Sequence, residues 1–295
     1  MLSNLSGTDA TGQQFVGAFR KRLQDLGWVD GRNVVIDVRW AAGDDALHKK
    51  YATELVAQAP DIILAATTPA VLALKKITST IPIVFGGVID PVGSGLVESL
   101  ARPGGNATGF VLFEYAIAAK WLDLIREIAP GVSRVAVLRD AAIASGIGQF
   151  AAVQTVARVN VELRAIGLGD SAQIEQSLAE FARNSNAGII ITGASYTVNH
   201  PDLLVAWAAR YKLPAVYPLR NFVDAGGLIS YGPDPVDPYR QGAGYVDRIL
   251  KGEKPSDLPV QAPTKYELLI NLKTAKTLGL TVPATLIARA DDVID

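Results

Sequence analysis

The sequence predicts an α/β protein built from two similar halves, each a doubly wound parallel sheet, on three observations. Segments with helical spacing of apolar residues alternate with strand-like segments through almost all of the 295 residues. The runs at 62–66 and 83–85 are short and apolar throughout, as expected of strands covered by helices on both faces. The alternation closes near residue 112 and restarts near residue 135, so the pattern occurs twice.

The first half is expected to begin at the end of a strand, because Met1-Leu2-Ser3 leads directly into a polar turn. We therefore expect further residues upstream in the native precursor. Apolar residues from Phe15 to Leu26 then recur at helical spacing, and Gly27 follows as a stop. Residues 34–40 alternate in polarity, which predicts a strand near a sheet edge. Further strands are predicted at 62–66, 83–85 and 107–112, with helices between them.

The second half repeats this order, and a short tail follows it. Strands are predicted at 135–138, 161–165, 189–191, 215–217 and 228–231, and helices around Trp121 and at 149–160, 171–183 and 203–211. The tail holds a helix at 239–250, a linker at 251–255 and a strand at 268–270. These elements are too few for a third domain, so we expect them to complete the first two.

The composition excludes several classes of protein. A net charge of -1 without a basic block provides no electrostatic footprint for nucleic acid or an anionic membrane. The absence of cysteine excludes disulfides, thiol nucleophiles and thiolate metal sites. The uncharged stretch 141–157 contains glycine and glutamine and is shorter than the roughly 20 apolar residues that a spanning helix needs.

Sequence motifs for catalysis are missing as well. Only His48 and His200 titrate near neutral pH without a perturbed pKa, and exposed or capping roles are favoured over catalysis for both. The chain has no phosphate loop, nucleophile elbow or histidine spacing for zinc. We therefore expect no enzymatic activity, no cofactor and no metal.

Polar residues do follow the predicted strands of the first half, at the edge where open α/β sheets bind ligands. The first such group is Ser3, Asn4 and Ser6. Thr67 and Thr68 come next, and a helix starting there would hold a carboxylate through its free N–H groups. Asp90 follows the third strand and would take an ammonium group. The alternatives remain open: an ordinary turn for the serines, Thr68 as the cap of a helix beginning at Pro69, and a capping role for Asp90.

The second half repeats the arrangement. Asp140, Ser195, Tyr196 and Tyr217, with Arg220 nearby, follow its strands. Polar groups and aromatic rings together would hold a small ligand that carries both charge and an apolar body. For the two tyrosines, packing at the surface of the second half is an equally open interpretation.

Motifs spread from end to end resemble one family. They are Gly31-Arg32-Asn33-Val34, Ile81-Pro82-Ile83-Val84-Phe85, the run Asp90 to Val97, the run Arg102 to Gly109, the run Ala225 to Gly232 and the run Lys265 to Ala275. This sequence is similar to the substrate-binding proteins of ABC importers that include the tryptophan-binding proteins of the TrpX type. The resemblance implies a type I periplasmic-binding fold, with two lobes joined by three hinge segments, and a periplasmic location with a signal peptide in the precursor.

The resemblance also implies domain boundaries and a binding site. We expect an N-terminal lobe of 1–112 plus about 233–263 and a C-terminal lobe of 113–232 plus about 264–295, with hinges near 110–115, 231–235 and 262–266. The ten polar residues named above would line the ligand. One departure matters: relatives commonly carry an Asn-Pro-rich loop where this chain has Arg139-Asp140 and 141–146, so tryptophan is not assumed.

The leading hypothesis is a non-catalytic extracytoplasmic receptor. It would close its two lobes on a small, carboxylate-bearing, amino-acid-like ligand, aromatic in one version, and deliver it to an ABC permease in the inner membrane. We expect a monomer that binds no nucleic acid. The alternative is a cytoplasmic enzyme or small-molecule sensor on the same scaffold, because a fold does not determine a function. A ligand-sensing transcription factor ranks last, since neither end of the chain carries a DNA-binding motif.

Overall fold

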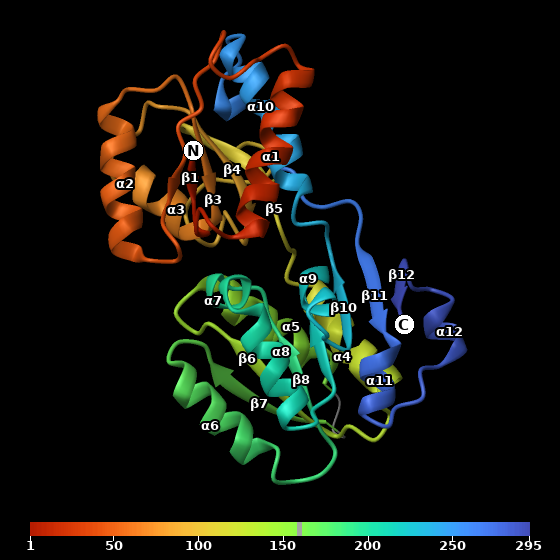
Figure 1. Cartoon of the computed structure of the whole chain (residues 1–295). Coiled ribbons are helices and arrows are strands. Elements are labelled where there is room, and N and C mark those ends of the chain that lie inside the picture. The colour runs from red at the N-terminus through yellow and green to blue at the C-terminus, as the bar shows by residue number, and fades with distance from the viewer. Residues whose placement is uncertain (158–160) are drawn as a thin grey trace. The chain divides into compact units, whose positions relative to one another are not determined.

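The computed structural model describes residues 1–157 and 161–295 as two compact α/β units (Figure 1). Unit 1 comprises 1–114 and 235–263, and unit 2 comprises 115–234 and 264–295. The chain therefore passes between the units three times, which is the connectivity of a three-segment hinge. The predicted helix at 149–160 ends earlier, at Val156, and residues 158–160 lie outside the described part.

Unit 1 contains a five-stranded parallel sheet in the order β2-β1-β3-β4-β5. The strands are β1 (Leu2–Ser3), β2 (Arg39–Trp40), β3 (Ile63–Ala66), β4 (Ile83–Val88) and β5 (Ala107–Val111). The helices are α1 (Ala10–Asp25), α2 (Asp45–Ala57), α3 (Thr67–Lys75) and α10 (Asp237–Leu250), followed by the short 3₁₀ turn η1 (Pro255–Asp257).

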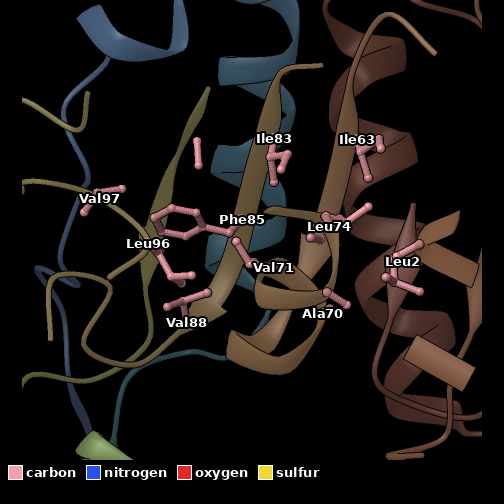
Figure 2. Packing of buried hydrophobic residues seen from close by; sticks show 14 of the residues in the cluster. Leu2, Ile63, Ala70, Val71, Leu74, Ile83, Phe85, Val88, Leu96 and Val97 are labelled. Carbon is pink, nitrogen blue, oxygen red and sulfur yellow. The ribbon is translucent and has the colours of Figure 1, made fainter. Parts of the chain in front are cut away.

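The two faces of this sheet are covered by different helices, because successive strand residues point to opposite sides. Ile63, Ile83 and Phe85 share a buried cluster with Val71 and Leu74 of α3 (Figure 2). The alternate residues Leu64 and Val84 lie against Gly242 of α10 on the other face. The fully apolar runs of the sequence are explained by this two-sided burial.

The predicted strand at 34–40 is wrong over most of its length, since only β2 at its end pairs with the sheet, at one edge. A side chain of the preceding turn binds a backbone group that the strand would use, since Asp30 Oδ1 accepts the Ile36 N–H at 3.0 Å. Asn33 Oδ1 accepts the Val29 N–H at 2.7 Å and fixes the turn itself. Val35 points into solvent and is 86% exposed. Local side-chain hydrogen bonds therefore override the alternating pattern here.

Unit 2 contains a seven-stranded sheet in the order β12-β11-β10-β9-β8-β6-β7. Its strands are β6 (Arg134–Arg139), β7 (Glu162–Gly167), β8 (Ala187–Ile191), β9 (Ala215–Tyr217), β10 (Ile229–Gly232), β11 (Glu267–Asn271) and β12 (Asp292–Ile294). The series β7-β6-β8-β9-β10 repeats the order of unit 1, so both sheets are wound alike. One pair departs from the parallel pattern: β11 runs antiparallel to β10. The connection explains this direction. The chain leaves unit 2 after β10, re-enters it at residue 264 and continues directly into β11, and no crossover helix packs on the sheet between the two strands.

The helices of unit 2 are α4 (Ile117–Ile128), α5 (Ala144–Val156), α6 (Ser171–Phe181), α7 (Ser195–Asn199), α8 (Pro201–Arg210), α9 (Arg220–Asp224), α11 (Leu272–Thr277) and α12 (Ala284–Ile287). In α4, Trp121 is fully buried, and its Nε1–H donates to the Tyr231 carbonyl at 2.7 Å. The sequence analysis missed α7 and α9, because five residues are too few for a helical period to appear. Along the described chain, every helix is too short or too polar to cross a membrane.

Candidate functional site

The strand order places a topological switch point in each sheet. The order reverses between β1 and β3 in unit 1 and between β6 and β8 in unit 2. Open α/β sheets bind ligands outside the carboxyl ends of the strands at such points, because the loops leave in opposite directions there. The residues that follow β1, β3, β6 and β8 are therefore the first candidates for ligand contact.

At the end of β1, Ser3 and Asn4 are buried, at 3% and 1% exposure. Ser3 Oγ accepts the Leu5 N–H at 3.2 Å, and the Asn4 carbonyl accepts the Gly43 N–H at 2.7 Å. Ser6 is partly exposed, and its hydroxyl is 3.0 Å from that of Thr8. The structure therefore places all three residues in a tight polar turn at the switch point of unit 1.

The helix after β3 starts differently from the expectation. It begins at Thr67, so Pro69 is its third residue, and the capping role predicted for Thr68 is wrong. The Thr68 hydroxyl instead makes a long hydrogen bond of 3.5 Å to the Ile89 carbonyl, which joins the ends of β3 and β4. No side chain caps the first turn, so its backbone N–H groups remain available to a ligand.

Thr67 itself has two unusual properties. Its φ is +72°, a left-handed conformation that β-branched residues rarely adopt. Its hydroxyl oxygen is buried and has no hydrogen-bond partner among the described residues. Because both properties cost free energy, and such residues cluster at ligand sites, Thr67 is a strong candidate for ligand contact.

Asp90 follows β4 and also has a left-handed backbone, with φ of +49°. Its Oδ1 accepts the Gly93 N–H at 2.8 Å and so caps the turn at 91–95, but no helix lies in the described stretch between β4 and β5, so the helix-capping alternative is wrong. Capping keeps the carboxylate beside the ends of β3 and β4, since Thr68 joins these two ends. The capping role is therefore compatible with an electrostatic role toward a ligand.

In unit 2, the structure joins residues from several strand ends. Asp140 follows β6, and its Oδ1 accepts the Ala142 N–H at 2.9 Å in a local turn. Tyr196 follows β8 and stacks on His200 with ring centroids 4.3 Å apart. The Tyr196 hydroxyl lies 2.7 Å from Ser171 Oγ at the start of α6. Ser195 begins α7, and its side chain lies outside the described part of the structure.

Tyr217 lies apart from this group. It is 1% exposed, its ring stacks on Phe222 at 4.9 Å, and burial raises the pKa of its hydroxyl. It lines a cavity of about 170 Å³ together with Val205 and Thr274, on the side of α8 and α11. Arg220 is engaged elsewhere, in ion pairs with Asp224 and Asp292.

Three residues that the sequence analysis did not single out belong to the switch point of unit 2. Thr192 Oγ1 donates to the Leu138 carbonyl at 2.8 Å, which joins the ends of β6 and β8. Gln149 is fully buried, and its Oε1 accepts the Gly193 N–H at 3.1 Å. Arg139 is the last residue of β6, and its guanidinium lies 4.6 Å from the centre of the Phe150 ring. A charged residue at the carboxyl end of a strand whose interior is apolar was the signal available for Arg139.

The histidines differ from each other. His48 in α2 is 2% exposed, so the exposed or capping role expected of it is wrong, and burial lowers its pKa. His200 is exposed, precedes α8, and its Nδ1 lies 2.9 Å from the Tyr196 carbonyl. Within the residues described, no three or more metal-ligating side chains gather in one place.

Comparison with known proteins identifies several that this chain resembles. The chain is 27% identical over 263 residues to a tyrosine-binding protein of Clostridioides difficile, covering 89% of this chain and 75% of that protein. The structure matches that of a conserved domain protein from Vibrio cholerae with a TM-score of 0.91 and 28% identity, covering 99% and 98% of the chains. It matches the L-Trp complex of an ABC domain from Streptococcus pneumonia with a TM-score of 0.91 and 24% identity, over the same shares.

The structural matches show the two-lobed type I periplasmic-binding fold that the sequence predicts. The model of one protein family, described as ABC transporter substrate binding protein, matches residues 8–294. This match spans both units and all three passages between them. The chain therefore belongs to the ABC transporter substrate-binding protein family.

Proposed function

We propose that this protein is the extracytoplasmic receptor of an ABC importer that captures an amino-acid-like, carboxylate-bearing ligand and delivers it to a membrane permease. The observation that carries the proposal is the start of α3, where an uncapped helix N-terminus adjoins the buried, unpartnered hydroxyl of Thr67. Free N–H groups at a helix N-terminus favour an anion. The receptor acts as a periplasmic or lipid-anchored monomer.

Each group at the edge of unit 1 has a role in this proposal. The first turn of α3 and the Thr67 hydroxyl take the ligand carboxylate, and Asp90 takes the ammonium group. Ser3, Asn4 and Ser6 add short polar contacts from the neighbouring strand. Tyr196 and Asp140 contribute from unit 2, the first through its ring. Aromatic amino acids are the first class to test, because one relative binds tyrosine and one matching structure holds L-Trp.

The surroundings of the two histidines support a binding protein rather than an enzyme. His48 is enclosed in the core of unit 1, and His200 Nδ1 contacts a backbone carbonyl rather than a nucleophile. Neither arrangement pairs a base with a nucleophile and an orienting acid. The alternative of an enzyme or cytoplasmic sensor would require that the bound molecule be turned over, or that the native precursor lack a secretion signal.

A thermal-shift screen of the ligand-stripped protein tests the proposal directly. The panel contains the amino acids, aromatic carboxylates, sugars and nucleosides. A ligand present at about 100 times its dissociation constant adds roughly 2.7 kcal/mol, a shift of several degrees. A hit with an amino acid that is recovered unchanged supports the receptor. Chemical alteration of the hit, or hits confined to sugars and nucleosides, would contradict it.

Asp90→Asn tests the ammonium role. The amide oxygen can still accept the Gly93 N–H and asparagine tolerates the left-handed backbone, so the loop is kept while the charge is removed. We expect an amine-bearing ligand to bind about tenfold more weakly or worse, and its deaminated analogue to be unaffected. Asp30→Asn, which also retains its acceptor for the Ile36 N–H and lies before β2, away from the carboxyl edge of the sheet, is the matched control. Equal losses for both ligands would remove Asp90 from this role.

A further inference from the structure

Arg139 is a cation at the switch point of unit 2. Its side chain is half-buried against the Phe150 ring, at 4.6 Å from the ring centre. Its Nε is buried and has no hydrogen-bond partner among the described residues. In the described part of the chain no carboxylate pairs with it. A buried Nε–H without an acceptor is unusual, because buried polar atoms in proteins are normally hydrogen-bonded.

The other end of the same strand provides an internal comparison. Arg134 begins β6 and stacks on Phe181 at 4.5 Å, much as Arg139 stacks on Phe150. Arg134, however, is satisfied: its Nε donates to Glu162 at 3.1 Å and its Nη1 donates to the Phe181 carbonyl at 3.2 Å. The sheet therefore pairs its arginine at the amino end of β6 and leaves the one at the carboxyl end unpaired.

The surroundings of Arg139 add further hydrogen-bond donors. The first turn of α5 lies directly against the end of β6, since a Cβ on Gly146 would come within 1.8 Å of the Asp140 carbonyl oxygen. No side chain caps this turn. Gln149 in the same helix is fully buried, and its Nε2 has no partner among the described residues. The nearest carboxylate in sequence, Asp140, accepts the Ala142 N–H through Oδ1.

Hydrogen bonds and a ring contact hold Arg139 and Gln149 close to the ends of β6 and β8. Thr192 joins the ends of β6 and β8, Gly193 donates to Gln149, and the residue after Gln149 supports Arg139. At the switch point of unit 2, the Nε–H of Arg139 and the Nε2 amide of Gln149 therefore lack acceptors among the described residues. An oxyanion would supply the missing acceptors, and the planar guanidinium matches a carboxylate in particular, because it can donate two parallel hydrogen bonds.

We propose that Arg139 binds a carboxylate of the transported ligand and makes unit 2 selective for ligands that carry this group. This inference rests on the proposed receptor function and adds a specificity-determining residue to it. The carboxylate has two possible sources, the α-carboxylate of an amino acid and a carboxylate on its side chain. Ligand pairs that differ only in one of these groups distinguish the two sources.

The test combines spectroscopy and calorimetry on the full-length protein. The Arg139 Nε–H resonance is assigned by its loss in Arg139→Gln, and its shift is followed during titration. L-tryptophan, tryptamine and indole-3-propionate differ in the α-carboxylate and the amine. L-phenylalanine and 4-carboxy-L-phenylalanine differ in the side-chain carboxylate. Dissociation constants are measured for the natural protein, Arg139→Gln, Arg139→Lys and the matched control Arg134→Gln.

We expect the carboxylate that Arg139 recognises to move the Nε–H resonance to saturation. Arg139→Gln should weaken that ligand roughly 10- to 100-fold, while Arg139→Lys keeps part of the affinity as a point charge. A ligand without that carboxylate should bind both variants as it binds the natural protein. Arg134→Gln should leave every dissociation constant unchanged, although it removes a stabilising ion pair.

The opposite results separate the two proposals. If an amino acid binds but the Arg139 resonance stays in place and Arg139→Gln binds equally well, the Arg139 inference is overturned and the receptor function stands. If indole-3-propionate moves the resonance while no amino acid binds, Arg139 is supported and the amino-acid assignment fails. If only tryptamine binds, with the resonance unmoved, both proposals fail.

Discussion

The two units share one strand order, yet the carboxyl ends of their sheets differ in chemistry. In unit 1 this edge carries hydroxyl and amide groups, and three residues without the freedom of glycine, Ala42, Thr67 and Asp90, have left-handed backbones there. In unit 2 the edge carries the cation Arg139, and the non-glycine left-handed residues described, Asn186 and Lys212, precede their strands. The shared strand order determines where the carboxyl edge of each sheet lies. The residues in the loops at that edge determine whether it contains strained backbone or a charged side chain.

The difference has an energetic consequence. A non-glycine residue in a left-handed conformation costs of order 1–3 kcal/mol, which the surrounding structure must supply. Unit 1 therefore stores backbone strain beside its candidate carboxylate site. Unit 2 instead accepts the cost of a partly desolvated charge at Arg139, which a bound anion would reduce. Three substitutions and one change of pH test this difference between the two units, and they follow in order of decreasing expected effect.

The largest effect is expected for Gly146→Ala at the start of α5. The new Cβ would lie 1.8 Å from the Asp140 carbonyl oxygen, so the helix would have to leave the end of β6. We expect a loss of about 3 kcal/mol or more in the free energy of unfolding of unit 2. Denaturant unfolding followed by tryptophan fluorescence measures it. Gly167→Ala is the matched control, because nothing lies within 4 Å of its Cβ position; equal stability of the two variants would contradict the packing argument.

Acid should weaken unit 1 through His48. Burial lowers the pKa of this ring below its ordinary value of 6.5, against the opposing attraction of Asp45 and Asp44. The unfolded chain therefore binds the proton more readily, so the stabilisation is complete above pH 6.5 and is lost as the pH falls toward the lower folded pKa. The slope is at most about 1.4 kcal/mol per pH unit.

Hydrogen exchange of the α2 and α3 amides between pH 7.5 and 5 measures this loss. His48→Leu should flatten the profile, because both ring nitrogens lack hydrogen-bond partners among the described residues and leucine keeps the apolar contacts. An unchanged pH profile in the leucine variant would show that another group is responsible.

Thr67→Val distinguishes the effect of the buried hydroxyl on the free energy of unfolding from its effect on ligand affinity. The side chain keeps its branched shape and loses only an oxygen without a protein partner, so the free energy of unfolding should rise by up to about 1 kcal/mol. Ligand affinity should fall about tenfold if this hydroxyl binds the carboxylate. Thr68→Val, which loses a long hydrogen bond of 3.5 Å, is the control. A rise in stability without a loss of affinity would assign Thr67 to strain alone.

The smallest effect is expected for Tyr217→Phe. Its ring stacks on Phe222 inside unit 2, so removal of the hydroxyl should leave ligand affinity within a factor of two and stability within about 1 kcal/mol. Calorimetric titration with the ligand found in the thermal screen measures the first quantity. A tenfold loss of affinity would return Tyr217 to the binding site.

The buried strands and long helices were predictable because their signals are local. Apolar runs such as β3 and β8 reflect burial on both faces, and α4 shows its apolar stripe directly. The candidate site was only partly predictable. Thr67, Asp90 and Asp140 were found because they follow strands, whereas Gln149 and Thr192 act through partners more than 40 residues away.

The sequence by itself determined the alternation of elements, the repeated α/β pattern and the family, since these depend on periodicity and on contiguous motifs. Only the tertiary structure decided which polar residues share an edge and which are enclosed. It placed Tyr217 and His48 inside their units and left the Arg139 Nε without a hydrogen-bond partner among the residues that the structure describes. The burial of a side chain and its pairing depend on contacts with residues far away in the sequence. At the switch point of unit 2 these contacts form only when β6, β8 and α5 pack together, so a local sequence pattern does not predict them.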